Sequence, residues 1–335
     1  MTSIDSQHVT VHDFRVMGTD ARIVLRAPEA DAAPFLEEAV RELQELQERL
    51  TRFDPSSELE QLNDARTAHV SPVLLELLEA ARDYQAQTEG RFNVGLGTKL
   101  IAAGYDQTFT QLRTVDDATR SDLHERMLTH GSSDAKASSA PAGAATAAAA
   151  ASFDIDGDRV LLHGDARIDL GGLAKGWSAD RIAQRLRERS GCSVLVSLGG
   201  DVGIQVVDGD EPWPISASVG DGGEMTLALA FGGLATSGWD GRMWMRGEAS
   251  GDDPRDDLSD VAHHVIDPVT GAPAVTDIAR ITVIGASCVD AEVWAKALML
   301  VGADAAAREA TERGITAIIV RADGSCILTG ALAPA

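Results

Sequence analysis

The sequence predicts an α+β fold in which antiparallel sheets pack against helices. Strand and helix candidates alternate irregularly along the chain, which argues against the regular β–α–β order of a doubly wound fold. After residue 152, Asp-Gly and Gly-Gly dipeptides separate the strand candidates, and such dipeptides favour tight turns between antiparallel strands. The 335 residues can bury a large core, and with only 4% aromatic residues that core must consist mainly of Ala, Val, Leu and Ile.

The N-terminal part predicts two strands, two helices and an insertion. Strands are expected at 9–16 and 21–26, joined by Met17-Gly18-Thr19. A helix at 31–50 is predicted because apolar residues recur at steps of three and four. A second helix at 72–88 ends before Gly90. The Ala- and Ser-rich stretch at 131–152 can bury little, so it predicts a disordered insertion.

The C-terminal part is rich in strand candidates. The expected strands are 153–155, 159–163, 193–207, 215–219, 225–231, 278–286 and 317–321, and the expected helices are 173–189 and 290–313, the latter as two short helices before Gly314. We find no internal repeat, and the length allows either two domains or one large domain.

Charge and cysteine content exclude several classes of partner. Acidic residues outnumber basic ones by 52 to 29, and the net charge of −23 repels nucleic acid and anionic lipid. The three cysteines are far apart and form no disulfide framework. No signal peptide and no apolar run of membrane-spanning length is evident, so we expect a cytoplasmic protein without membrane insertion.

Three glycine-containing segments are candidates for ligand contacts. The segment 168–177 places Asp169 and two glycines before a helix, with Lys175 near its start; it is either an anion site or simply a tight strand-to-helix connection. The segment 197–201 is either a hairpin bend or part of a site. In the third segment, 234–238, the hydroxyl of Thr236 either contacts a ligand or supports a turn.

Two further segments carry groups that are able to do chemistry. His264 titrates near neutral pH and can move a proton, although a hairpin with an incidental histidine would give the same sequence. Strand alternation would place His264 and Ile266 on one face. On the helix after Cys288, Glu292 and Lys296 are four residues apart, so they form either a helix ion pair or, through Glu292, a magnesium ligand.

Eight segments, taken in order, resemble the ApbE family of FAD:protein FMN transferases. They are MGT from Met17, FDPSSELEQLN from Phe53, GRFNVGLGTKL from Gly90, DLGGLAKGW from Asp169, SLGGD from Ser197, ATSG from Ala235, HVIDPVTGAP from His264 and the helix after Cys288. The resemblance spans about residues 10–330 and implies a single domain with an α+β fold close to the T-fold. It also implies transfer of FMN from FAD to a Thr or Ser hydroxyl of an acceptor protein, with release of AMP. Hydrolysis of FAD to FMN and AMP, or FAD binding without catalysis, are the alternatives.

The resemblance also assigns residues to roles. His264 matches the catalytic histidine, and Gly172, through its carbonyl, and Glu292 match magnesium ligands. The positions that match or are expected to be FAD-contacting residues are Met17, Phe53, Arg91, Phe92, Asn93, Asp169, Lys175, Thr236 and Ile266.

The last helix departs from the family pattern. Relatives show A-D-x-x-x-T, in which Asp and Thr oxygens ligate magnesium, and the matching residues here are Ala291, Glu292 and Lys296. An ammonium group cannot ligate a cation and repels Mg²⁺. Two expectations follow: Mg²⁺ binds at an altered site that includes Glu292, which we favour, or Lys296 itself neutralises the pyrophosphate.

Overall fold

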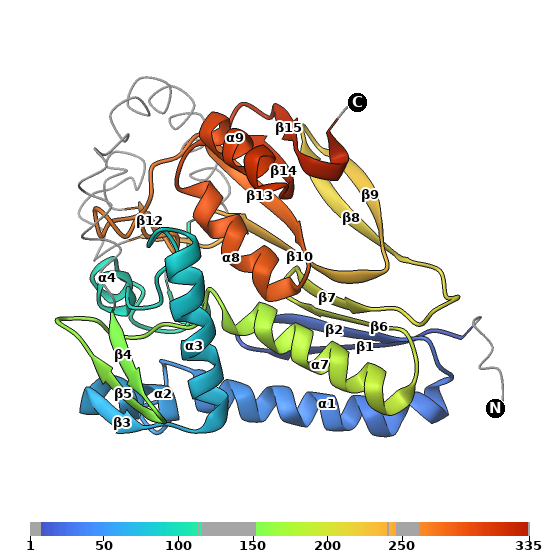
Figure 1. Ribbon diagram of the computed structural model, residues 1–335, viewed down its shortest axis with the longest axis horizontal. Helices are drawn as coiled ribbons and strands as arrows, with labels where there is room; N and C mark the ends of the chain where they lie inside the picture. The colour runs from blue at the N-terminus through green and yellow to red at the C-terminus, as the bar shows by residue number, and fades with distance from the viewer. Residues whose placement is uncertain (1–7, 113, 116–151, 240, 246–260, 334–335) are drawn as a thin grey trace.

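The computed structural model describes residues 8–112, 114–115, 152–239, 241–245 and 261–333 (Figure 1). Its largest element is an eight-stranded sheet with the order β1-β2-β6-β7-β10-β13-β14-β15, in which every neighbouring pair is antiparallel. These strands are β1 (Thr10–Val16), β2 (Thr19–Leu25), β6 (Val194–Leu198), β7 (Asp201–Gln205), β10 (Phe231–Gly238), β13 (Ile278–Gly285), β14 (Thr316–Arg321) and β15 (Cys326–Leu328).

The remaining elements cover this sheet or extend beside it. The helices are α1 (Glu29–Leu50), α2 (Glu58–Ala65), α3 (Pro72–Gln87), α4 (Gly97–Ala102), α7 (Ala174–Ser190), α8 (Cys288–Met299) and α9 (Ala303–Arg313). The smaller sheets contain β3 (Thr67–His69), β5 (Arg159–Leu162) and β4 (Phe153–Asp156), then β8 (Trp213–Gly220) with β9 (Gly223–Leu229), and β11 (Met243–Met245) with β12 (Val261–His263). Within the described part of the chain, no helix is long and apolar enough to cross a membrane.

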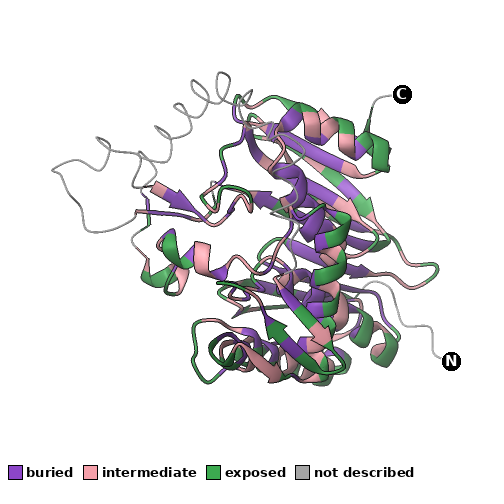
Figure 2. Ribbon diagram, turned by 60° about the vertical axis from the view of Figure 1, so that its left-hand side comes forward, coloured by how far each residue is buried: buried purple, intermediate pink, exposed green. Residues whose placement is uncertain are grey.

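The two faces of the large sheet are covered differently, because side chains alternate along each strand. On β14, Ala317 and Ile319 pack with α8 and α9, whereas Ile318 and Val320 pack with the β8–β9 hairpin. The same helix-covered face carries α7 and, beneath it, α1 (Figure 1). Buried residues therefore run through the strands of the sheet (Figure 2) and through α8. The prediction that the core consists mainly of Ala, Val, Leu and Ile is confirmed.

The sequence patterns predicted most helices and strands correctly. The expected helices at 31–50, 72–88 and 173–189 correspond to α1, α3 and α7, and 290–313 is indeed two helices. The stretch 193–207 is two strands, and the hairpin bend lies at Gly199–Gly200. The turn expected at 234–238 is wrong, because these residues continue β10. The insertion predicted at 131–152 lies outside the described residues apart from Ser152.

Two glycines bring α7 and α8 close to the sheet. A side chain at Gly203 of β7 would collide with the backbone of Ala179 in α7, and one at Gly233 of β10 would lie 2.3 Å from the backbone nitrogen of Cys288. Real Cβ atoms do not approach other atoms so closely, so each contact requires a glycine.

Replacing Gly233 with alanine is expected to lower the free energy of unfolding by about 1–3 kcal/mol, because the start of α8 would have to move away from β10. Urea denaturation of the variant measures this change. Gly241→Ala is the matched control, since a methyl group at Gly241 meets no atom within 4 Å. Equal stability of the two variants would contradict the close packing of α8.

Candidate active site

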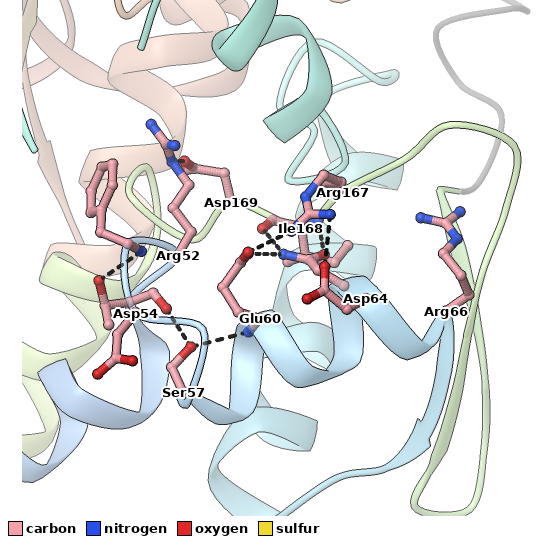
Figure 3. Close-up of polar contacts among 12 residues, drawn as sticks. Arg52, Asp54, Ser57, Glu60, Asp64, Arg66, Arg167, Ile168 and Asp169 are labelled. Carbon is pink, nitrogen blue, oxygen red and sulfur yellow. Dashed lines mark hydrogen bonds and ion pairs between the residues drawn. The ribbon is translucent and has the colours of Figure 1, made fainter. Parts of the chain in front are cut away.

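The turn before α7 is held in place by α2, a helix that the sequence patterns did not predict. Asn63 of α2 binds both backbone groups of Ile168: its Oδ1 accepts from the N–H at 2.6 Å and its Nδ2 donates to the carbonyl at 3.0 Å. Arg167 pairs with Glu60 and Asp64 of the same helix (Figure 3). The backbone that leads into Asp169 is therefore held rigidly.

Asp169 is held by an arginine that no motif indicated. The Nε of Arg52 donates to Oδ2 of Asp169 at 2.5 Å, and the two side chains point toward each other in Figure 3. The guanidinium of Arg52 also lies 4.2 Å from the ring centre of Phe53 and 4.6 Å from that of Tyr105. Because Phe53 is 37% exposed, this group offers a flat aromatic surface next to a buried ion pair.

The centre of the site is a buried cluster of two ammonium and two carboxylate groups. Lys175 of α7 donates to Oδ2 of Asp201 and, at 2.5 Å, to Oε1 of Glu292. Lys296, one turn after Glu292 on α8, donates to the same Oε1 at 3.0 Å. Glu292 is fully buried and Asp201 is 4% exposed, so these charges interact in a region from which water is largely excluded.

The pKa values in this cluster follow from burial and from the opposite charges. Burial alone would raise the pKa of Glu292, but Lys175 and Lys296 outweigh burial and hold that pKa at about 2. Burial would lower the pKa of Lys175, but the carboxylates of Asp201 and Glu292 raise it well above its ordinary value. Glu292 and Lys175 are therefore both charged at neutral pH.

Helices α7 and α8 cap each other. The backbone N–H of Gly176, in the first turn of α7, donates to Oε2 of Glu292 at 2.8 Å. Conversely, Asp180 of α7 accepts from the backbone N–H groups of Cys288 and Val289, at 2.8 and 2.9 Å, at the start of α8. Each helix thus supplies the carboxylate for the unpaired amides of the other.

Two turns of the large sheet approach the cluster. A side chain at Gly199 would lie 2.4 Å from the hydroxyl of Thr19, so the turn after β6 lies against the turn that contains Met17. Met17 itself adopts a positive φ of 53° and packs among core residues of α1 and α7. The turn after β6 leads directly into Asp201, the partner of Lys175.

His264 immediately follows β12 and is partly buried. Its Nδ1 lies 3.5 Å from the carbonyl oxygen of Arg242. Burial, together with the positive charges of Arg242 and Lys296, lowers the pKa of His264 to about 3, so the imidazole is neutral at pH 7 and can accept a proton. The strand alternation expected for His264 and Ile266 is wrong, because β12 ends at His263.

Three further predicted residues, Gly172, Phe92 and Ile266, pack against the residues described above. A methyl group on Gly172 would lie 3.1 Å from Cε of Lys296 and 3.5 Å from the ring of Phe92, so both side chains pack against this glycine. Ile266 belongs to the same apolar cluster as Tyr105 and Trp244.

Other predicted residues are engaged elsewhere. Both terminal nitrogens of Arg91 bind Glu309 of α9, at 2.6 and 2.7 Å. Asn93 accepts hydrogen bonds from the backbone N–H of Gly95 and from the hydroxyl of Ser152. Thr236 lies on the face of β10 opposite α8, where its hydroxyl lies 2.8 Å from that of Thr282. The structure gives these three assignments no support.

The residues missed in the sequence were Arg52, Asp201 and Tyr105. Asp201 stands in a recognised segment, SLGGD, but nothing in the local sequence shows that it faces Lys175. Arg52 and Tyr105 stand outside the recognised segments and far apart in the sequence, and only the fold brings them together.

Comparison with solved structures shows which known fold this chain has. The chain superimposes on an ApbE protein from Thermotoga maritima with a TM-score of 0.73, at 22% identity over 96% of this chain and 97% of that one. It superimposes on the flavinyl transferase ApbE of Pseudomonas stutzeri with a TM-score of 0.72, at 22% identity over 98% of both chains. The α+β fold with antiparallel sheets is therefore that of ApbE structures, as predicted.

The sequence itself defines the family. The model of the ApbE family matches residues 17–330, so this chain belongs to the ApbE family. It is 27% identical over 311 residues to an FAD:protein FMN transferase of Treponema pallidum, covering 86% of this chain and 77% of the relative. It is 24% identical to an FAD:protein FMN transferase of Escherichia coli K12, covering 96% and 86%.

Proposed function

We propose that this chain is an FAD:protein FMN transferase, which moves the FMN half of FAD to a Thr or Ser hydroxyl of an acceptor protein and releases AMP. Membership of the ApbE family and the names of the relatives support this proposal. The observation that carries it is the position of Lys296, which packs against Gly172 in the Asp169–Lys175 turn and donates to Glu292, the partner of Lys175.

In the proposed reaction, the neutral imidazole of His264 takes the proton of the acceptor hydroxyl. The hydroxyl oxygen forms a bond to the phosphorus of the FMN half, and the bond from that phosphorus to the bridging oxygen of the pyrophosphate breaks. AMP leaves with the electron pair of that bond. Phosphoryl transfer depends on positioning and on stabilisation of negative charge, which the nearby ammonium groups supply.

The aromatic group beside Asp169 is suited to a flat ring. Phe53 is partly exposed, and Arg52 and Tyr105 support it from behind. Stacking on such a surface suits either ring system of FAD. Local positive charge is needed as well, because the net charge of −23 repels an anionic dinucleotide.

The magnesium site that the resemblance implies does not fit the residues present. Both carboxylate oxygens of Glu292 already accept hydrogen bonds, Oε1 from Lys175 and Lys296, and Oε2 from Gly176. Mg²⁺ requires a nearly octahedral shell of oxygen ligands, and two ammonium groups at this carboxylate oppose it. Among the described residues, no group of three or more acidic, His or Cys side chains could hold a metal ion.

The function is tested by incubating the protein with FAD, with and without a flavin-acceptor domain, and separating the products. Flavin bound covalently to the acceptor, with an equal amount of AMP, is the expected result. Free FMN and AMP in the absence of acceptor would instead indicate a hydrolase. Intact FAD in every reaction, despite tight binding, would indicate a binding protein and contradict the proposal.

Arg52→Lys is expected to weaken FAD binding about tenfold, because an ammonium cannot bind Asp169 and also stack on Phe53 as a guanidinium does. Quenching of flavin fluorescence measures the affinity. Arg185→Lys is the matched control, since Arg185 forms partly exposed ion pairs with Glu38 and Glu42 on α1. An unchanged affinity of Arg52→Lys for FAD would mean that Arg52 does not contribute to FAD binding.

A further inference from the structure

Lys296 lies where the resemblance expects a metal ion, between Gly172 and Glu292. Its Nζ donates to Oε1 of Glu292 at 3.0 Å and approaches the Glu292 carbonyl at 3.4 Å. Its methylene groups pass along Gly172, where a methyl group would lie 3.1 Å from Cε and 3.2 Å from Cδ. The side chain thus passes one expected ligand position, Gly172, and its charged end lies at the other, Glu292.

The position of Lys296 is fixed, yet its end remains accessible. Glu292 is fully buried and anchored by Lys175 and by Gly176 of α7, so it holds the ammonium of Lys296 from one side. The Lys296 side chain is nevertheless 22% exposed. An ammonium has three N–H groups, and Glu292 accepts at most two of them here, which leaves a donor for a further acceptor.

The charge of Lys296 also reaches the other parts of the site. Its positive charge contributes to the lowered pKa of His264 and opposes the effect of burial on the pKa of Asp201, so it acts on both the expected base and the buried cluster. This is the place where the proposed reaction needs positive charge.

We propose that the ammonium group of Lys296, held by Glu292, replaces a divalent cation in this chain and binds the pyrophosphate of FAD directly, so that FAD binding and flavin transfer need no metal. The inference rests on the proposed function only for the transfer step. Lys175 remains the structural partner of Asp201 and Glu292, and Lys296 is the group that contacts substrate.

The test compares wild type, Lys296→Thr, Lys296→Met and Arg308→Thr. Lys296→Thr removes the ammonium and introduces a hydroxyl oxygen that can ligate a metal, whereas Lys296→Met removes the ammonium alone. Arg308→Thr removes an exposed positive charge on α9 and is the matched control. FAD affinity is measured by flavin fluorescence in EDTA and in Mg²⁺, Mn²⁺ binding by the loss of the free-ion EPR signal, and transfer with an acceptor domain under the same conditions.

Wild type and Arg308→Thr are expected to bind FAD and transfer FMN equally, within about twofold, in EDTA and in Mg²⁺. In EDTA, both Lys296 variants should bind FAD at least about tenfold more weakly, since a charge-assisted hydrogen bond is lost. Mg²⁺ should restore binding in Lys296→Thr but not in Lys296→Met, and Mn²⁺ should bind only to Lys296→Thr.

Three results would overturn the inference: wild type that binds Mn²⁺, wild type that loses FAD affinity in EDTA, or a folded Lys296→Met that binds FAD as tightly as wild type. If transfer nevertheless proceeds in Mg²⁺, the proposed function stands without the inference. Tight, metal-independent FAD binding without transfer in any reaction would have the opposite meaning: the pyrophosphate site at Lys296 stands and the proposed function fails.

Discussion

His264→Ala is expected to lower the rate of flavin transfer at least about 100-fold, because a positioned general base contributes a factor of this size or more. FAD affinity should stay within about threefold of wild type, since the imidazole acts on the acceptor hydroxyl and the ammonium of Lys296 remains. Product analysis gives the rate, and flavin fluorescence gives the affinity.

The ionisation of His264 adds a second readout. Because burial and neighbouring positive charge lower its pKa to about 3, the imidazole is already neutral at pH 6. The wild-type rate should therefore not fall between pH 8 and pH 6 through protonation of His264. His69→Ala is the control, as the His69 side chain is 73% exposed on a peripheral strand. Transfer at the wild-type rate by His264→Ala would remove this residue from the mechanism.

Glu292→Ala is expected to lower the free energy of unfolding by about 3–5 kcal/mol, because it leaves the ammonium groups of Lys175 and Lys296 without their shared carboxylate. The lowered pKa of Glu292 has the same sign, because it means that the folded protein favours the ionised carboxylate.

The sign of this contribution sets its pH dependence. The folded-state pKa of Glu292 is lowered, so the stabilisation is fully present above pH 4.5 and is lost as the pH falls toward 2. Urea denaturation at pH 7 and pH 4 should therefore show the gap between wild type and Glu292→Ala narrowing in acid. Glu188→Ala, on the exposed side of α7, is the control.

A double variant separates charge pairing from packing. The double variant Lys175→Met, Glu292→Met should lose less unfolding free energy than the two single variants together. The reason is that the double change removes both members of this ion pair, so that neither is left buried without the other. A loss of less than about 1 kcal/mol in Glu292→Ala would mean that Asp201 alone is sufficient to hold both lysines.

Local patterns in the sequence predicted the regular elements well. The apolar repeat before Leu50 and the glycine that follows α9 mark helices whose buried faces the structure contains. The residues 234–238 were misread because a strand segment with one glycine and two hydroxyls has the composition of a turn.

The candidate site was only partly predictable, for a physical reason. Lys175, Glu292 and His264 stand in recognisable segments, but hydrogen bonds such as Arg52 to Asp169 join positions 117 residues apart. The sequence also showed that Lys296 stands where a hydroxyl is usual, yet not that both oxygens of Glu292 are taken by donors. Pairings across the fold are set by packing, which no local pattern contains.

The mutual capping of α7 and α8 limits how this chain can change in length. Its hydrogen bonds join residues that are 108 and 116 positions apart in the sequence. One residue inserted between Gly176 and Asp180 would turn the carboxylate of Asp180 by about 100° around α7, away from the start of α8. An insertion before Glu292 would do the same to the cap of α7. Insertions and deletions in the two helices must therefore be matched or avoided, and loops elsewhere can accept them more freely.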